Sequence, residues 1–233
     1  MGGLHLPPLE ILTSIIIVIF FGIGIHEYAH CKVADMAGDP TPRYYGRVTL
    51  NLFKHFEPVG TLMMVISSIS GVGIGWGRPA PVDPSKMRNP RWDAFASVLA
   101  GPMSNFLQAI IYALALRILL AQGSITFTQV LSALNRDSTS FLAALVTTGV
   151  LINVSLMLFN LIPLGPLDGH WLLGYLLPEP IRTKWFQFSR TTGSALLIGL
   201  ILLSQLSAIS LLGRVLGPLL IRVFTFLTGL PLA

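Results

Sequence analysis

The chain has 233 residues, of which 53% are hydrophobic and only 11% are charged, and its mean hydropathy is +0.73. A soluble domain carries about 25% charged residues, so this composition excludes an ordinary soluble domain and indicates a polytopic membrane protein. The net charge of +5 would suit nucleic acid, but the basic residues flank apolar segments instead of forming one patch. A positive-inside bias explains them better, and no nucleic-acid partner is expected.

Five apolar segments come close to the ~20 residues that a helix needs to cross a bilayer. In chain order they cover residues 9–31, 93–121, 140–163, 191–209 and 211–230. They predict an all-α polytopic membrane protein with about five spanning helices. A sixth apolar stretch, residues 59–76, is short and rich in Gly and Ser, and the run GRPAPVDP that follows cannot be helical throughout.

The distribution of basic residues helps to place residues 59–76. Loops 32–59, 77–92 and 164–190 carry four, four and three Lys or Arg residues, whereas loop 122–139 carries one. If residues 59–76 spanned the membrane, two strongly basic loops would lie on opposite faces. If the segment enters and leaves on one side, all three basic loops are cytoplasmic. We therefore expect a re-entrant segment, with six spanning helices as the alternative.

This topology has a consequence for two polar motifs. The first helix runs from outside to inside, residues 93–121 return, and residues 140–163 run to the inside again. The C-terminal ends of the first and third spanning helices therefore lie on the same face. Each of these ends carries an unusual polar motif, HEYAH at residues 26–30 and PLDGH at residues 166–170.

The first motif has the pattern H-E-x-x-H. On a helix, His26 and His30 lie one above the other on one face, so both can bind a single Zn²⁺. Glu27 projects beside the metal, where a general base for a zinc-activated water would stand. The alternative is that both histidines are hydrogen-bonded core residues and that burial keeps the glutamate neutral. Three ionisable residues within five positions of a membrane helix are costly, and a metal compensates for that cost.

A catalytic zinc usually has three protein ligands and an open position, so a third ligand should exist elsewhere. Asp168 is the best carboxylate available, because Asp35, Asp39 and Asp83 lie in loops and Asp137 is predicted outside. The helix breakers of residues 163–166 should leave the helix end unwound, and Asp168 then sits in this break. Its alternative is an ordinary helix-terminating turn. His170 could compete for the metal. His55 is expected to be a surface-loop histidine, with a role beside the site or facing the substrate as the alternative.

HEYAH together with NLIPLGPLDG (160–169) resembles the site-2 protease family of intramembrane zinc metalloproteases. Three further runs, GDPTPRYYGRVTLN (38–51), GWGRPAPVDP (75–84) and LAGPMSN (99–105), are similar to the compact prokaryotic branch without PDZ or CBS domains. The resemblance covers roughly residues 20–175. It implies one Zn²⁺ held by His26, His30 and Asp168, with Glu27 as general base and acid and Asn160 binding the substrate strand or polarising the scissile carbonyl.

The resemblance implies a single membrane-embedded metalloprotease domain over residues 1–233, with a catalytic core of about 9–175 and a C-terminal helical pair of about 190–230. The expected function is zinc-dependent endoproteolysis of transmembrane segments of membrane-anchored proteins. The expected location is the cell membrane, in contact with the lipid bilayer and with the site toward the cytoplasm. Two alternatives stay open: a metal or ion transporter that uses the His/Glu/Asp cluster as a transit site, and a non-catalytic scaffold that retains zinc.

Overall fold

The computed structural model describes residues 7–69, 77–206 and 211–231, and these residues form helices and connecting turns without a strand. The elements, in chain order, are α1 (Leu9–Met36), α2 (Thr41–Tyr44), η1 (Leu52–His55), α3 (Pro58–Ile69), η2 (Pro84–Lys86), α4 (Trp92–Ala121), α5 (Phe127–Asn135), α6 (Phe141–Asn160), α7 (Asp168–Leu176), α8 (Ile181–Phe188), η3 (Ser189–Gly193), α9 (Ser194–Leu206) and α10 (Leu211–Thr228). The prediction of an all-α fold is confirmed.

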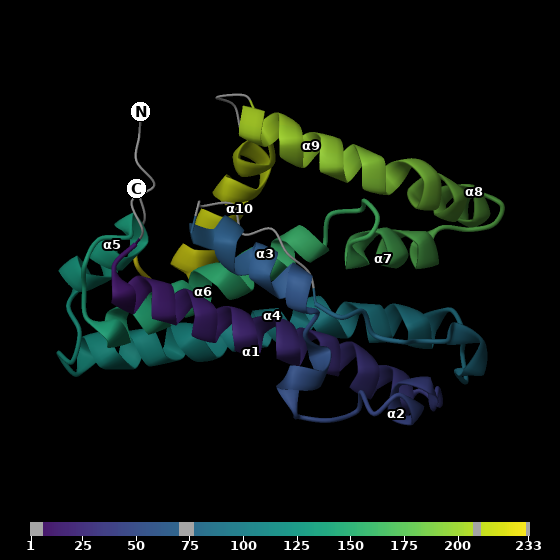
Figure 1. Ribbon diagram of the computed structural model, residues 1–233, viewed down its shortest axis with the longest axis horizontal. Helices are drawn as coiled ribbons and strands as arrows, with labels where there is room; N and C mark the ends of the chain where they lie inside the picture. Colours follow the sequence, from purple (N-terminus) through teal and green to yellow (C-terminus); the bar gives the residue numbers. More distant parts are fainter. Residues whose placement is uncertain (1–6, 70–76, 207–210, 232–233) are drawn as a thin grey trace.

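Four helices within the described ranges are long and apolar enough to cross a membrane: Leu9–Met36, Trp92–Ala121, Phe141–Asn160 and Ile181–Leu203. The fourth combines α8, η3 and α9 into one rod, which lies apart from α1 and α4 in Figure 1. The last predicted segment, residues 211–230, corresponds to α10. Part of the predicted segment 191–209, residues 207–209, falls outside the described residues.

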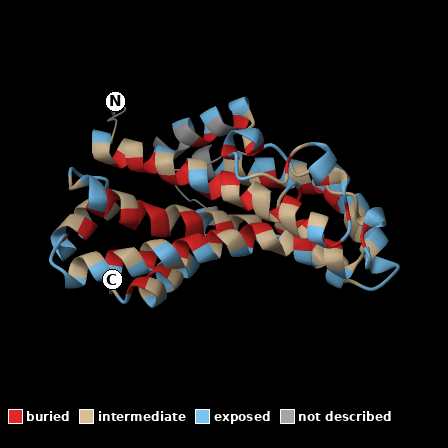
Figure 2. Cartoon of the chain, turned by 90° about the horizontal axis from the view of Figure 1, so that it is seen from below, coloured by how far each residue is buried: buried red, intermediate tan, exposed pale blue. Residues whose placement is uncertain are grey.

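The core is formed where α1, α4 and α6 lie side by side (Figures 1 and 2). Every fourth residue of α1 from Ile11 to Ile23 is buried against α3, α5 and α6. Because lipid tails are as apolar as these side chains, close contact between small and large residues must hold membrane helices together. A Cβ at Gly149 of α6 would lie 2.3 Å from the ring of Tyr112 on α4, so only glycine permits this approach.

Helix α1 is longer than the predicted segment 9–31. Its 28 residues span about 42 Å, whereas the hydrocarbon core of a bilayer is about 30 Å thick. The predicted apolar segment ends at Cys31, but the helix continues through Lys32 and Asp35 to Met36. Gly38 then adopts a φ of +108°, which a residue with a side chain rarely adopts, and the chain turns away.

Helix α3 covers the first part of the predicted re-entrant segment 59–76, of which residues 70–76 lie outside the described residues. Its 12 described residues span about 18 Å. Phe56, just before α3, stacks on Phe20 of α1, and Gly77, just after the segment, lies against Ile23 of the same helix. Phe56 and Gly77, on either side of this segment, therefore lie beside the same part of α1, and the choice between a re-entrant and a spanning segment stays a prediction.

The two basic loops that flank this segment are joined to each other. Asp39 accepts a hydrogen bond from the backbone N–H of Asp83 at 2.7 Å, and the Arg47 guanidinium donates to the carbonyl of Arg78 at 2.5 Å. The backbone N–H of Arg78 in turn donates to the carbonyl of His55. These bonds place both loops at the same end of α1.

Candidate metal centre

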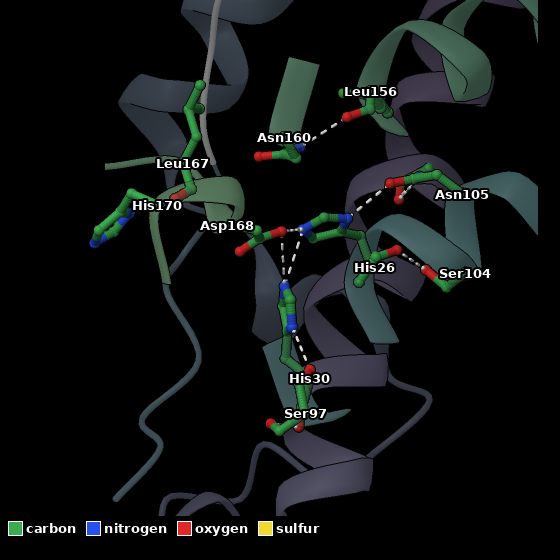
Figure 3. A network of polar contacts seen from close by, with 12 residues as sticks. His26, His30, Ser97, Ser104, Asn105, Leu156, Asn160, Leu167, Asp168 and His170 are labelled. Carbon is green, nitrogen blue, oxygen red and sulfur yellow. Dashed lines mark hydrogen bonds and ion pairs between the residues drawn. The ribbon is translucent and has the colours of Figure 1, made fainter. Parts of the chain in front are cut away.

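His26 and His30 are separated by one turn of α1, and both are 7% exposed. Their Nε2 atoms lie 3.0 Å apart, with the rings nearly perpendicular. The i, i+4 spacing stacks the two side chains on the face that α1 presents to α4, so the helix itself brings the two nitrogens together. Figure 3 shows both rings directed toward Asp168.

Asp168, at the start of α7, lies next to the two histidines. Its Oδ2 lies 3.2 Å from His26 Nε2 and 3.4 Å from His30 Nε2. The predicted unwound end of the third spanning helix covers residues 161–167, but Asp168 itself is the first residue of α7. A carboxylate is favoured in the first turn of a helix, because the backbone N–H groups there are unpaired. The expectation that the aspartate lies within the unwound break was therefore wrong by one residue.

Gly169 explains how α7 can begin so close to the end of α6. A Cβ at this position would lie 2.3 Å from the carbonyl oxygen of Leu161 and 2.4 Å from that of Ile162. Any side chain here would push the start of α7 away from α6. The Asp-Gly pair therefore combines a ligand-type side chain with a backbone that can lie directly against the preceding helix.

The hydrogen bonds at the two Nδ1 atoms show why His26, His30 and Asp168 suit a metal ion. His26 Nδ1 lies 2.7 Å from Asn105 Oδ1, and His30 Nδ1 lies 2.8 Å from the carbonyl of Ser97. Both partners are acceptors, so both Nδ1 atoms carry the proton and both Nε2 atoms present a lone pair. Asp168 Oδ2 is buried and has no hydrogen-bond partner in the described part of the chain. Three electron-pair donors thus converge within 4.8 Å of one another, an arrangement that a cation stabilises.

Helix α4 forms the wall behind the two rings. A Cβ at Gly101 would lie 2.3 Å from both Cε1 and Nε2 of His30 and 2.8 Å from Cε1 of His26. Ser97, one turn earlier, accepts from His30 through its carbonyl and donates from its hydroxyl to the His30 carbonyl at 3.0 Å. The run LAGPMSN therefore contains the residue that leaves room for the imidazoles and, in Asn105, a residue that orients one of them.

Glu27 is partly buried on the face of α1 next to the two histidines. Its carboxylate lies beside Gly77, where a Cβ would be 3.0 Å from Glu27 Oε1. No described residue donates a hydrogen bond to this carboxylate. The Glu27 side chain also lines the cavity described below.

The cluster opens into a cavity of about 1030 Å³. The lining follows α1 from Ile11 to His30, a length of roughly 28 Å, and continues to Tyr175 of α7. Asn160 also lines the cavity, with its amide nitrogen donating to the carbonyl of Leu156 at 3.0 Å (Figure 3). The remaining lining is mainly aliphatic and includes residues of α6 and α10. The cluster of three donors thus lies near one end of a long, mostly apolar cavity.

Comparison with known proteins supports the same chemistry. The model of peptidase family M50 matches residues 14–204. The chain belongs to peptidase family M50. It is also 34% identical over 180 residues to "Putative zinc metalloprotease YwhC" of Bacillus subtilis (strain 168), an alignment that covers 77% of this chain and 76% of that protein. No solved structure matches the chain. It is therefore a metalloprotease, and its family and relative imply zinc as the metal.

The other two histidines considered above do not join the cluster of this M50 peptidase. His170 lies on α7, but its Nδ1 bonds to the carbonyl of Leu167 at 2.5 Å and its ring packs against Trp171. His55 is fully buried, so the expectation of a surface-loop histidine was wrong. It bonds to the carbonyl of Thr49 at 3.0 Å and faces the ring of Tyr28, and burial lowers its pKa.

Sequence reasoning missed the residues that hold α7, the helix that carries Asp168. The Arg91 guanidinium donates to three carbonyls at the C-terminal end of α7, at 2.7 Å (Tyr175), 3.2 Å (Leu176) and 3.3 Å (Leu177). Trp185 of α8 donates from its indole to the carbonyl of His170 at 2.8 Å. In the sequence, Arg91 is simply one more basic residue beside an apolar segment, which gives no sign of this contact.

The arginine contact gives a testable prediction for the M50 peptidase. Arg91→Lys should lower the midpoint of thermal unfolding by about 2–4 °C, because a compact ammonium cannot bond to three carbonyls as the forked guanidinium does. Tryptophan fluorescence of the detergent-purified protein would measure the midpoint. Arg88→Lys is the matched control, since Arg88 donates from its side chain to one carbonyl, that of Met36. An equal shift in both variants would contradict the prediction.

Proposed function

We propose that this M50 metalloprotease is an intramembrane endopeptidase that cleaves transmembrane segments of membrane-anchored proteins. The observation that carries the proposal is the position of the donor cluster, on a membrane-type helix and at one end of a mostly aliphatic cavity. The cavity lining extends along about 28 Å of α1, close to the ~30 Å thickness of a bilayer core. A cavity of this length and polarity suits a transmembrane segment better than a soluble peptide.

In this proposal His26, His30 and Asp168 hold one Zn²⁺ per chain. The metal, when bound, supplies Lewis-acid chemistry that polarises a carbonyl and makes water a stronger acid. Glu27 is the general base and acid: its carboxylate takes a proton from the attacking water and later delivers it to the leaving amine. The position of Glu27, one residue from His26 and open to the cavity, supports this assignment.

The substrate must unwind before it can be cut. In a helix each carbonyl accepts a backbone hydrogen bond, so the scissile carbonyl is not accessible to a nucleophile. Asn160 lines the cavity, and its amide oxygen accepts no hydrogen bond from any described residue. We assign Asn160 to binding the backbone of the unwound substrate strand, which would replace the hydrogen bonds that the substrate loses.

The arrangement of the chain in the cell follows from the same topology. The two joined basic loops lie at the C-terminal end of α1, which also carries the cluster. The positive-inside rule then puts this end, and the site, on the cytoplasmic side of the cell membrane. We propose a single membrane-embedded domain over residues 1–233, with a catalytic core of about 9–175 and a C-terminal helical pair of about 190–230.

Metal removal tests the function directly. The purified protein, reconstituted in lipid vesicles with a single-span substrate, should cut within the transmembrane segment. A chelator should abolish cleavage and added Zn²⁺ should restore it, because the proposed chemistry needs the metal. Mass spectrometry of the products would locate the cut.

Two results would contradict the proposal. Cleavage that resists chelation would exclude the metal chemistry, and cleavage only in soluble parts of the substrate would exclude the intramembrane site. A transporter would instead move Zn²⁺ across the vesicle membrane without any cleavage, which a zinc-sensitive dye trapped inside the vesicles would report.

A further inference from the structure

We propose that Asn105 and Asn153 are positioning residues that determine which nitrogen of His26 faces the metal. Both are fully buried, one in α4 and one in α6, and neither belongs to the HEYAH or PLDGH motif. The inference rests on the proposed metal site, but it concerns the orientation of a ligand and not the reaction.

The hydrogen bonds of Asn105 allow only one orientation of its amide. Its Nδ2 donates to the carbonyl of Gly22 at 3.0 Å and to Asn153 Oδ1 at 3.1 Å. Both of these partners are acceptors, so the amide nitrogen must lie on their side. Oδ1 is thereby left facing His26 Nδ1 at 2.7 Å, and it can only accept. His26 must therefore carry its proton on Nδ1 and present the Nε2 lone pair to the site.

Asn153 fixes this orientation from the next helix. Its own Nδ2 donates to the carbonyl of Gly149 at 2.9 Å, which turns its Oδ1 toward Asn105. If the Asn105 amide were reversed, two amide oxygens would face each other and an N–H would face His26 Nδ1. The ring would then place its proton on Nε2, where it would block metal binding. A chain of hydrogen bonds from the Gly149 carbonyl through Asn153 and Asn105 thus fixes the orientation of the His26 ring.

His30 provides an internal comparison. Its Nδ1 bonds to the backbone carbonyl of Ser97, and a backbone carbonyl can only accept. The proton on His30 Nδ1 therefore does not depend on any side-chain amide. If the two asparagines only hold the helices together, their loss should change the Nδ1–H hydrogen bonds of both histidines alike. If they orient His26, the loss should affect His26 alone.

The test uses the full-length protein and measures zinc affinity by competition with a chromophoric chelator. Partners of metal-binding histidines typically contribute 10–100-fold to metal affinity. We expect Asn105→Leu to weaken zinc binding by about this factor and Asn153→Leu to weaken it by less. Asn105→Asp keeps the acceptor for His26, but its second oxygen faces the Gly22 carbonyl and Asn153 Oδ1, so it should restore only part of the affinity lost in Asn105→Leu. Thr147→Val is the matched control in α6, because Thr147 is fully buried and its hydroxyl has no hydrogen-bond partner among the described residues.

Nuclear magnetic resonance of the zinc-loaded protein with ¹⁵N-labelled histidine gives a second readout. The Nδ1–H signal of His26 should exchange faster with solvent in Asn105→Leu, while that of His30 should not change. Wild-type zinc affinity in a folded Asn105→Leu protein, equal losses in Thr147→Val, or equal changes at both histidines would overturn the inference. None of these measurements requires cleavage, so a wild-type protein that binds zinc but does not cut would contradict the proposed function alone.

Discussion

Replacing Glu27 by Gln is expected to abolish cleavage while zinc remains bound. The amide has nearly the same shape as the carboxylate, but it cannot take a proton from water. Loss of a general acid–base group typically lowers a rate by about 10²–10⁴-fold. Zinc content should not change, because the donors that converge are on His26, His30 and Asp168, and Glu27 lies beside them. Rates on a single-span substrate and zinc analysis of the same preparation would measure both effects.

Glu179→Gln is the matched control for this substitution. Glu179 lies at the surface before α8, where it bonds to Arg182 and Thr183, and it does not line the cavity. Cleavage by this variant should equal that of the wild type. Undiminished cleavage in Glu27→Gln would remove Glu27 from the mechanism. Loss of zinc in that variant would instead make it a ligand.

Gly101→Ala should weaken zinc binding although it adds only one methyl group. The new Cβ would lie 2.3 Å from the His30 ring and 2.8 Å from that of His26, well inside van der Waals contact. The His30 ring cannot easily turn away, because its Nδ1 is bonded to Ser97 of the same helix α4. Either the ring or the helix must move, and both movements separate the three donors. We expect zinc affinity to fall at least 10-fold, with cleavage falling in parallel.

Gly199→Ala makes the same change where nothing lies within 4 Å of the added carbon. Gly199 is also in a helix, α9, so the effect of alanine on helix propensity is matched. This control should bind zinc as the wild type does. Normal zinc affinity in Gly101→Ala would show that α4 can move away from the histidines without disturbing the donors.

The convergence of His26, His30 and Asp168 could be predicted because each step used a pattern that can be read directly from the sequence. Helical periodicity aligned the two histidines, and counting spans and basic loops put Asp168 at the same face of the membrane. The helix breakers before the aspartate were also visible. What remained hidden was that the chain resumes a helix at Asp168 itself, because Gly169 allows a close approach that no local pattern reveals.

The supporting residues could not be found in the same way. Asn105 is 79 positions from His26, and Arg91 is 84 positions from the first carbonyl that it binds. Contacts at such separations depend on how whole helices pack, and a polar residue in an apolar segment looks the same whether it orients a ligand or faces a neighbour. The end of α1 was missed for a related reason: hydropathy marks where a helix leaves the bilayer, not where it stops.

The separation of the donors along the chain also determines at which stage of synthesis the peptidase can become active. His30 and Asp168 are roughly 140 residues apart, and ribosomes add about 5–20 residues per second. For roughly ten seconds of synthesis, the newly made protein therefore carries only two of its three proposed ligands. During that interval α4 and α6 must be made before the loop that ends in Asp168. A protease built in this order has no complete set of donors while α1, α4 and α6 are being made.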